Sequence, residues 1–220
     1  TTHSPFLIDS NRLDEIRIVY KDGKYCKINN YFSVNVVEDV SGTDSLESIK
    51  KSMTFQNMAS ILYKDKGTQF YLVEGIIDYA ILTYLKRIDE KYNNLHFLPI
   101  NGINAKNTNE EKRKSLISEI TKIYGSNAKI IVDNDKAGIE FEKSTKKYKT
   151  DIIVRNLSEI GKTDIESFFL KDDLKIIQFG KSKSASKPLG LLSSSEKPSD
   201  IFSKETINNF IKFLDLLLND

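Results

Sequence analysis

The feature that most constrains the fold is a pair of short apolar runs that each end in acidic residues. Residues 70–73 (Phe-Tyr-Leu-Val) lead directly into Glu74-Gly75, and residues 129–132 (Lys-Ile-Ile-Val) lead into 133–135 (Asp-Asn-Asp). Runs of this length, each followed by a helical pattern, are typical of buried strands in a parallel sheet. The carboxyl ends of such strands lie at one edge, where ligands bind. The sequence therefore predicts an α/β fold in which the two acidic strand ends lie at the same edge.

From residue 69 onward the chain alternates between strand and helix patterns, which predicts a mainly parallel, doubly wound sheet flanked by helices. The predicted strands are 70–73, 95–100, 129–132 and 151–154, and the predicted helices are 78–88, 110–124, 137–147 and 203–218. Residues 180–200 are rich in Ser, Lys, Gly and Pro and lack an apolar period. We expect an exposed loop there.

The first 67 residues follow a different pattern. Strand-forming residues alternate on both sides of Asp22-Gly23, which predicts a β-hairpin over residues 15–28. A polar connector over 36–47 precedes a helical spacing over 46–62. The predicted divisions are residues 1–35 with the hairpin, 36–67 as a connector with a helix, and 68–220 as the α/β domain with a C-terminal helical extension.

Composition excludes several classes of protein. The single cysteine, Cys26, excludes a disulfide framework and a cysteine-rich zinc site. The net charge of +2 does not by itself indicate a polyanionic partner. Nucleic acid would have to contact local lysine groups, such as those at 112–114, 143–149 and 181–187. No apolar run is long enough for a membrane span, so we expect a cytoplasmic protein without a membrane partner.

Further carboxylates are expected at the same edge of the sheet. They lie at the start of the helix after Glu74 and in the loop after the fourth strand. The candidate metal ligands are Glu74, Asp78, Asp133, Asp135, Asp164 and Glu166. Crowded carboxylates repel each other unless cations separate them. Oxygen ligands without nearby His or Cys favour Mg²⁺ or Mn²⁺, and a pair of such ions supports phosphodiester hydrolysis. Each acidic step alone is also compatible with a turn or a helix cap.

The order of these motifs resembles the TOPRIM (topoisomerase–primase) domain, which has Glu-Gly after its first strand and Asp-x-Asp after its third. Residues 73–78, 132–138 and 164–166 are more specifically similar to OLD (overcoming lysogenization defect) family nucleases, and the resemblance covers about 68–170. It implies a TOPRIM, Rossmann-like sheet and a two-metal nuclease that nicks or cuts DNA, often in anti-phage defence. The six acids would hold two Mg²⁺ or Mn²⁺ ions, with Glu74 and Asp133 central to catalysis.

The resemblance also implies a catalytic lysine after the last acidic motif. The candidates are Lys181, Lys183 and Lys187. Spacing does not choose among them; we favour Lys183 as the catalytic residue, with Lys181 and Lys187 as DNA contacts. The alternative is a mobile basic loop that contacts backbone phosphates or nothing.

In the OLD family an ABC-type ATPase precedes the TOPRIM domain in the same polypeptide. Residues 1–5 resemble its switch-histidine segment, in which His3 would sense the γ-phosphate, so we interpret 1–35 as the end of that domain. The 220 residues contain no Gly-x-x-x-x-Gly-Lys-Ser/Thr loop. ATP would therefore act only through the preceding ATPase. The implied partners are DNA, further copies of the full-length protein and a helicase-like protein.

Two other functions stay open. Haloacid dehalogenase-type phosphatases also place Asp-x-Asp after a strand of a doubly wound sheet, and Asp172-Asp173 could serve as their distal acidic pair. That family carries its Asp-x-Asp on the first strand, whereas here the pair follows the third. The second alternative is a TOPRIM-like module that binds DNA or partner proteins without catalysis.

Overall fold

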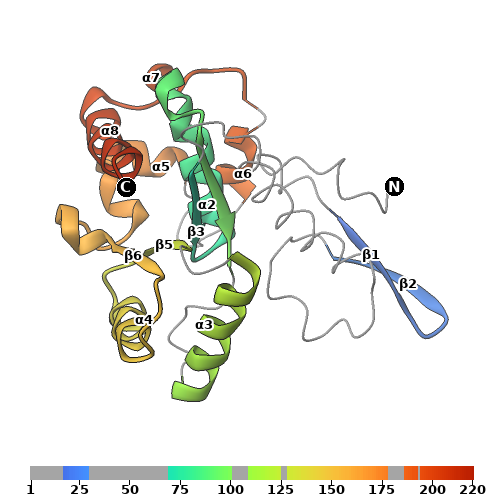
Figure 1. Ribbon diagram of the computed structural model, residues 1–220. Helices are drawn as coiled ribbons and strands as arrows, with labels where there is room; N and C mark the ends of the chain where they lie inside the picture. The colour runs from blue at the N-terminus through green and yellow to red at the C-terminus, as the bar shows by residue number, and fades with distance from the viewer. Residues whose placement is uncertain (1–16, 30–68, 101–108, 125–127, 178–185, 193) are drawn as a thin grey trace.

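The computed structural model describes residues 17–29, 69–100, 109–124, 128–177, 186–192 and 194–220 (Figure 1). The predicted connector over 36–47 and the predicted helix over 46–62 lie outside these residues. The divisions at residues 35 and 67 therefore stay predictions.

A four-stranded parallel sheet forms the centre of the fold, with strand order β4-β3-β5-β6. The strands are β3 (Gln69–Val73), β4 (Leu95–Pro99), β5 (Lys129–Val132) and β6 (Ile153–Asn156). The fourth strand begins two residues later than its apolar run predicts, because Ile153 N donates to Ala128 O at 2.8 Å and starts the ladder there. The predicted α/β, Rossmann-like fold is confirmed.

Helices cover both faces of this sheet. The principal helices are α2 (Ile76–Leu85), α3 (Glu110–Tyr124), α4 (Lys136–Lys147) and α8 (Lys204–Leu218). Figure 1 shows α3 and α4 on one side of the sheet and α2 and α8 on the other. The chain runs from β3 outward to β4, then returns past β3 to β5, and this reversal places the crossover helices on opposite faces. The switch point lies between β3 and β5, where ligands bind in open sheets.

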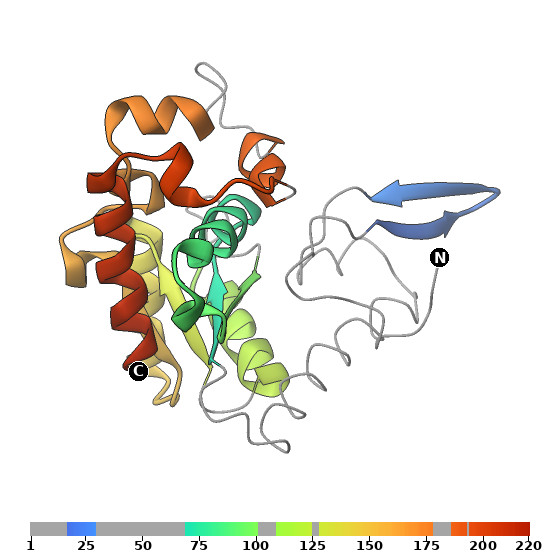
Figure 2. The same cartoon turned by 90° about the horizontal axis from the view of Figure 1, so that it is seen from above.

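The C-terminal third adds three short helices that cover α2 and the start of α8 (Figure 2). They are α5 (Lys171–Ile177), α6 (Ser186–Leu192) and α7 (Pro198–Ile201). The expectation of one exposed loop over 180–200 is therefore wrong for the described residues. Pro188 and Leu192 are buried, and Arg87 donates to the carbonyl oxygens of Leu192 at 2.7 Å and Ser194 at 3.0 Å. The apolar residues are too few to show a helical period.

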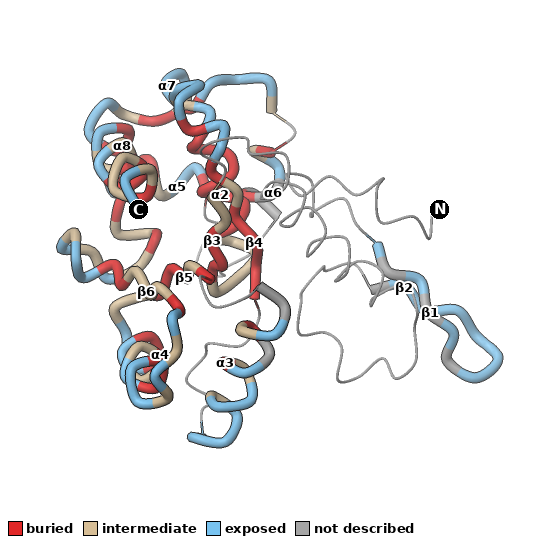
Figure 3. Tube along the Cα trace, in the orientation of Figure 1, coloured by how far each residue is buried: buried red, intermediate tan, exposed pale blue. Residues whose placement is uncertain are grey.

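Single helical turns complete the connections. They are the 3₁₀ helices η4 (Lys86–Ile88), η5 (Glu90–Tyr92), η6 (Leu157–Ile160) and η7 (Ile165–Phe168). Figure 3 shows buried residues along the sheet and on the inner sides of α2 and α8. No helix among the described residues has the length and apolar character needed to cross a membrane.

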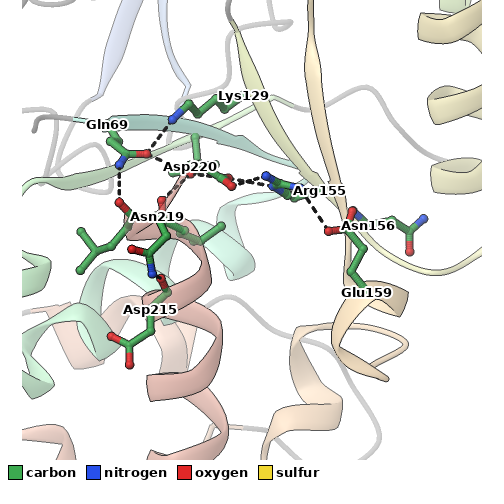
Figure 4. Close-up of polar contacts among 11 residues, drawn as sticks. Gln69, Lys129, Arg155, Asn156, Glu159, Asp215, Asn219 and Asp220 are labelled. Atoms are coloured by element: carbon green, nitrogen blue, oxygen red, sulfur yellow. Dashed lines mark hydrogen bonds and ion pairs between the residues drawn. The ribbon is translucent and has the colours of Figure 1, made fainter.

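The C-terminal end of α8 is anchored to the sheet by a polar network (Figure 4). Asp220 accepts hydrogen bonds from Arg155, whose Nε is 2.8 Å from Oδ2, and from the Tyr71 hydroxyl at 2.8 Å. Gln69 donates to Leu218 O at 3.0 Å. These residues come from β3, β6 and the end of α8, so the network joins strands that are far apart in sequence.

The predicted hairpin is present as β1 (Ile18–Asp22) and β2 (Tyr25–Asn29), which pair antiparallel. Gly23 has φ +59°, which the tight turn requires and which glycine adopts without strain. Val19, Tyr25 and Ile28 are exposed.

Candidate functional site

The two acidic strand ends lie side by side. β3 and β5 are neighbours in register, with Leu72 opposite Ile130. The Asp133 backbone N–H donates to Glu74 Oε1 at 2.9 Å, which joins the two strand ends directly. Both side chains are half-buried. Glu74 and Asp133 therefore occupy the switch point of the sheet, as a parallel arrangement predicts.

The two helices that leave this edge each begin with an acidic residue bound to backbone. Asp78 Oδ2 accepts the Gly75 N–H at 2.9 Å, so Asp78 is folded back toward the end of β3. Asp135 Oδ1 accepts the Gly138 N–H at 2.8 Å and caps α4. The helix-cap role that the sequence left open for Asp135 is thus present, and the hydrogen bond uses only one of its two carboxylate oxygens.

The loop after β6 brings the third acidic step to the same edge. Asn134 N–H donates to Thr163 O at 2.7 Å, which ties this loop to the end of β5. Asp164 Oδ1 accepts the Ser167 N–H at 2.8 Å and caps η7. Lys162 Nζ donates to Ser167 O at 3.0 Å and closes the loop further. As at Glu74 and Asp135, this backbone hydrogen bond engages one carboxylate oxygen of Asp164, and no hydrogen bond between described residues engages the other.

Burial and mutual repulsion raise the pKa of both central acids. Desolvation is the main cause for Glu74, with repulsion from Asp78 and Asp135 adding to it; the hydrogen bond from Asp133 N–H opposes them, and the pKa is raised to about 7. Desolvation and neighbouring charges raise the pKa of Asp133 to about 8. The neighbours responsible, largest contribution first, are Asp78, Glu74, Glu166 and Asp164. All six predicted ligands therefore belong to one electrostatically coupled group.

The two central acids of this group carry no counter-charge within the part of the chain that the structure describes. Among the described residues, no lysine or arginine forms an ion pair with Glu74 or Asp133. The oxygen-only donor set and the excess negative charge fit a hard divalent cation such as Mg²⁺ or Mn²⁺. Within the described part of the chain, however, no three such side chains are gathered to enclose an ion as they stand. Side-chain rotation would have to complete the coordination.

Gly138 is a structural requirement of the site that sequence reasoning missed. A Cβ at this position would lie 2.1 Å from the Asp133 carbonyl oxygen and 3.3 Å from Val132 Cβ. Only glycine lets α4 begin this close to the end of β5. A glycine three residues after Asp135 was visible in the sequence, but nothing there distinguished close packing from ordinary helix composition.

The candidate catalytic lysines of the basic loop and the proposed ATP-sensing histidine are outside the part that the structure describes. This holds for His3, Lys181 and Lys183. Lys187 lies in α6, although its side chain is not among those described. Their predicted roles stay predictions.

Several basic residues on α3 and α4 are neutralised by neighbouring acids. Arg113 pairs with Glu140 at 2.8 Å and Lys147 with Glu110. Lys146 pairs with Glu142 at 2.6 Å within α4. These contacts reduce the positive charge that the two lysine groups at 112–114 and 143–149 present to a phosphate backbone.

The two adjacent acids Asp172 and Asp173 lie in different environments, and only Asp173 has a structural role. Asp173 is buried and accepts hydrogen bonds from the hydroxyls of Ser203 and Thr206, both at 2.5 Å, at the start of α8. Asp172 points to solvent and pairs with Lys175 at 2.6 Å. Asp173 thus joins α5 to α8, and its carboxylate is already occupied by hydroxyl donors.

Comparison of the chain with models of protein families, with curated proteins and with solved structures finds no match. The resemblance to OLD nucleases therefore rests on the motifs and their order. The structure adds the spatial neighbourhood of those motifs: Glu74 and Asp133 share a hydrogen bond at the switch point of a parallel sheet.

Proposed function

We propose that this chain is the TOPRIM nuclease part of an OLD-family protein and hydrolyses phosphodiester bonds of DNA with two Mg²⁺ or Mn²⁺ ions. The observation that carries the proposal is the contact between Glu74 and Asp133 at the switch point, where both acids have raised pKa values and no cationic partner among the described residues. Divalent cations would stabilise the ionised form of such a cluster, because they offset the repulsion between its carboxylates. Paired metal ions in turn are suited to phosphodiester hydrolysis.

The residues of this chain would orient and hold the ions. The proposed ligands are Glu74, Asp78, Asp133, Asp135, Asp164 and Glu166. Bound ions would supply a nucleophilic water and stabilise the leaving 3′ oxygen. Backbone N–H groups fix one oxygen each of Glu74, Asp135 and Asp164, which limits the rotation of these ligands. By resemblance, Lys183 would neutralise charge on the reacting phosphate.

The wider assembly belongs to the same proposal. The resemblance places this chain after an ABC-type ATPase that controls cleavage with ATP. It also implies assembly of several copies, a helicase-like partner and a role in anti-phage defence. Each of these is an expectation from the resemblance, and none is needed for the chemistry of the acidic edge.

A plasmid-nicking assay tests the proposal. We expect the chain to nick or cut supercoiled DNA with Mn²⁺ or Mg²⁺ and to be inactive in EDTA. Glu74→Gln and Asp133→Asn should each lower the rate about a hundredfold or more, because each removes a charge that the ions require. Asp172→Asn is the matched control, since Asp172 is an exposed carboxylate and is not among the neighbours that raise the pKa of Glu74 or Asp133.

The control also tests for contaminating nucleases. Asp172→Asn protein purified in parallel should cut DNA at the rate of the unmodified chain. Full cleavage by Glu74→Gln or Asp133→Asn protein would refute the proposal. Release of phosphate from a small phosphoester without plasmid cleavage would instead support a phosphatase, although the buried, hydroxyl-bound Asp173 argues against one.

One observation favours a second candidate, a DNA- or partner-binding module without catalysis. The side chains of the described residues do not enclose an ion as they stand. Such a module would bind DNA without cleaving it, and Mn²⁺ would not raise its melting temperature. A Mn²⁺-dependent rise that Asp133→Asn abolishes would exclude this candidate.

A further inference from the structure

The acidic loop after β6 is seated on α8, a helix about forty residues later in the chain. Asn209 Nδ2 donates to Phe168 O at 2.9 Å. The Phe168 ring is fully buried and packs on Phe210 and Phe213, with centroid distances of 4.8 and 5.3 Å. The carbonyl and the ring of one residue, two positions after Glu166, therefore both contact α8.

A second hydrogen bond holds the same stretch of backbone. Leu170 N–H donates to Thr206 Oγ1 at 3.0 Å, and the Thr206 hydroxyl in turn donates to Asp173 Oδ2 at 2.5 Å. Thr206 is fully buried. Because Thr206 and Asn209 are three residues apart, they lie on the same face of α8. This face of the helix holds the backbone of residues 168–170 at two points.

The two halves of the acidic group are therefore positioned in different ways. Glu74 and Asp133 follow strands whose ladder fixes them. Asp164 lies eight residues beyond β6, after η6, where no strand pairing constrains it. On its near side the loop is tied to Asn134 through Thr163 O, and on its far side it is tied to α8.

We propose that α8 positions the Asp164–Glu166 half of the metal site and that Asn209 is its principal positioning residue. The inference rests on the proposed metal-binding function. Asn209 does not touch the ions; it holds the Phe168 carbonyl, and through it η7, whose first turn carries Glu166 and whose cap is Asp164. Losing the hydrogen bond loosens one half of the site and leaves the Glu74–Asp133 half in place.

Mn²⁺ titration of the full chain, followed by the electron paramagnetic resonance of the free ion, tests this role. The variant is Asn209→Ala and the matched control is Asn208→Ala, because Asn208 is the exposed neighbour on the same helix and the change in helix propensity is the same. We expect Asn209→Ala to weaken one class of bound Mn²⁺ about tenfold, as loss of outer supporting contacts typically does. The affinity of the other class and of the control should stay unchanged.

Melting temperature with and without Mn²⁺ separates positioning from plain stability. A purely structural hydrogen bond would lower the melting temperature equally in EDTA and in Mn²⁺, whereas a positioning role also shrinks the Mn²⁺-dependent rise. Asn209→Asp, which keeps the side-chain shape but removes the donor, should behave like Asn209→Ala and serves if the alanine variant does not fold. Unchanged Mn²⁺ binding in these variants would overturn the positioning role alone. No Mn²⁺ binding by the unmodified chain would overturn the proposed function and this inference with it.

Discussion

Asp220 and Asp133 lie at opposite ends of the sheet, and their carboxylates have opposite electrostatic environments. Burial alone would raise the pKa of Asp220, but hydrogen bonds from Arg155 and Tyr71 hold it below its usual value. At the other end, desolvation and neighbouring acids raise the pKa of Asp133 to about 8, and its backbone contact is with Glu74, another acid. Among the described residues, the fold therefore supplies a cation where Asp220 anchors the end of α8, and it supplies none beside Glu74 and Asp133.

The two ends are also held together differently. The Asp220 end depends on charged side chains, whereas the Glu74–Asp133 end depends on backbone hydrogen bonds and on the close approach of α4 at Gly138. Each kind of support predicts its own sensitivity to mutation.

The largest effect is expected from Gly138→Ala, which breaks the backbone support of the acidic edge. The added Cβ would lie 2.1 Å from the Asp133 carbonyl oxygen, so α4 or the end of β5 must shift. We expect a loss of about 3 kcal/mol in the free energy of unfolding, measured by urea denaturation. Gly190→Ala is the control: it lies in α6 with open space where a Cβ would lie, so it should be neutral or slightly stabilising.

The next largest effect is expected from Arg155→Ala, which removes the ion pair with Asp220 at the opposite end of the sheet. Arg155→Ala removes the cation that is hydrogen-bonded to the Asp220 carboxylate, whose side chain is only 4% exposed, and should cost about 2 kcal/mol. Urea denaturation measures the loss. The double variant Arg155→Met with Asp220→Asn should recover part of it, because no unpaired buried charge is left. A double variant less stable than Arg155→Ala alone would contradict this account.

The sequence predicted the Glu74–Asp133 end of the sheet better than the Asp220 end. Strand-ending acids such as Glu74 and Asp133 stand out because an apolar run is followed at once by a charge, and parallel strands bring such ends together. Asp220 and Arg155 are 65 residues apart and have no local pattern, so only the folded chain shows their pairing.

The same distinction explains the remaining misses. Asn209 and Gly138 act through contacts to backbone carbonyl groups. Every residue has such a group, so the sequence does not show which carbonyl is contacted. The helices α6 and α7 are too short for an apolar period, so their sequence is typical of a loop. By contrast, α8 was predicted within one residue because its apolar stripe is long and Ser203 caps it.

A smaller effect is expected in the pH dependence of the free energy of unfolding, which tests whether Glu74 and Asp133 lack a counter-charge. Between the ordinary carboxyl pKa near 4 and the raised values of about 7 and 8, the folded chain holds protons that the unfolded chain has released. The free energy of unfolding in EDTA should therefore fall as pH rises from 5 to 8. Because both groups are only half-buried and water screens them, we expect a fall of about 1–2 kcal/mol, well below the full conversion of the two pKa shifts. Asp133→Asn should remove much of the fall, and so should Mn²⁺. A free energy that rises over this range in EDTA would contradict the deficit.

The smallest effect concerns a carboxylate in a third environment, open solvent. Asp172 has a side chain that is 90% exposed, and among the described residues it pairs with Lys175 alone, one turn along α5. Water screens this pair, so Asp172→Asn should change the free energy of unfolding by less than about 0.5 kcal/mol. The pH dependence in EDTA and the Mn²⁺-dependent rise in melting temperature should both match those of the unmodified chain. If Asp172→Asn flattened the pH dependence as Asp133→Asn does, the effect would come from general surface charge. The pH dependence would then not distinguish the Asp133 end of the sheet from other acidic sites.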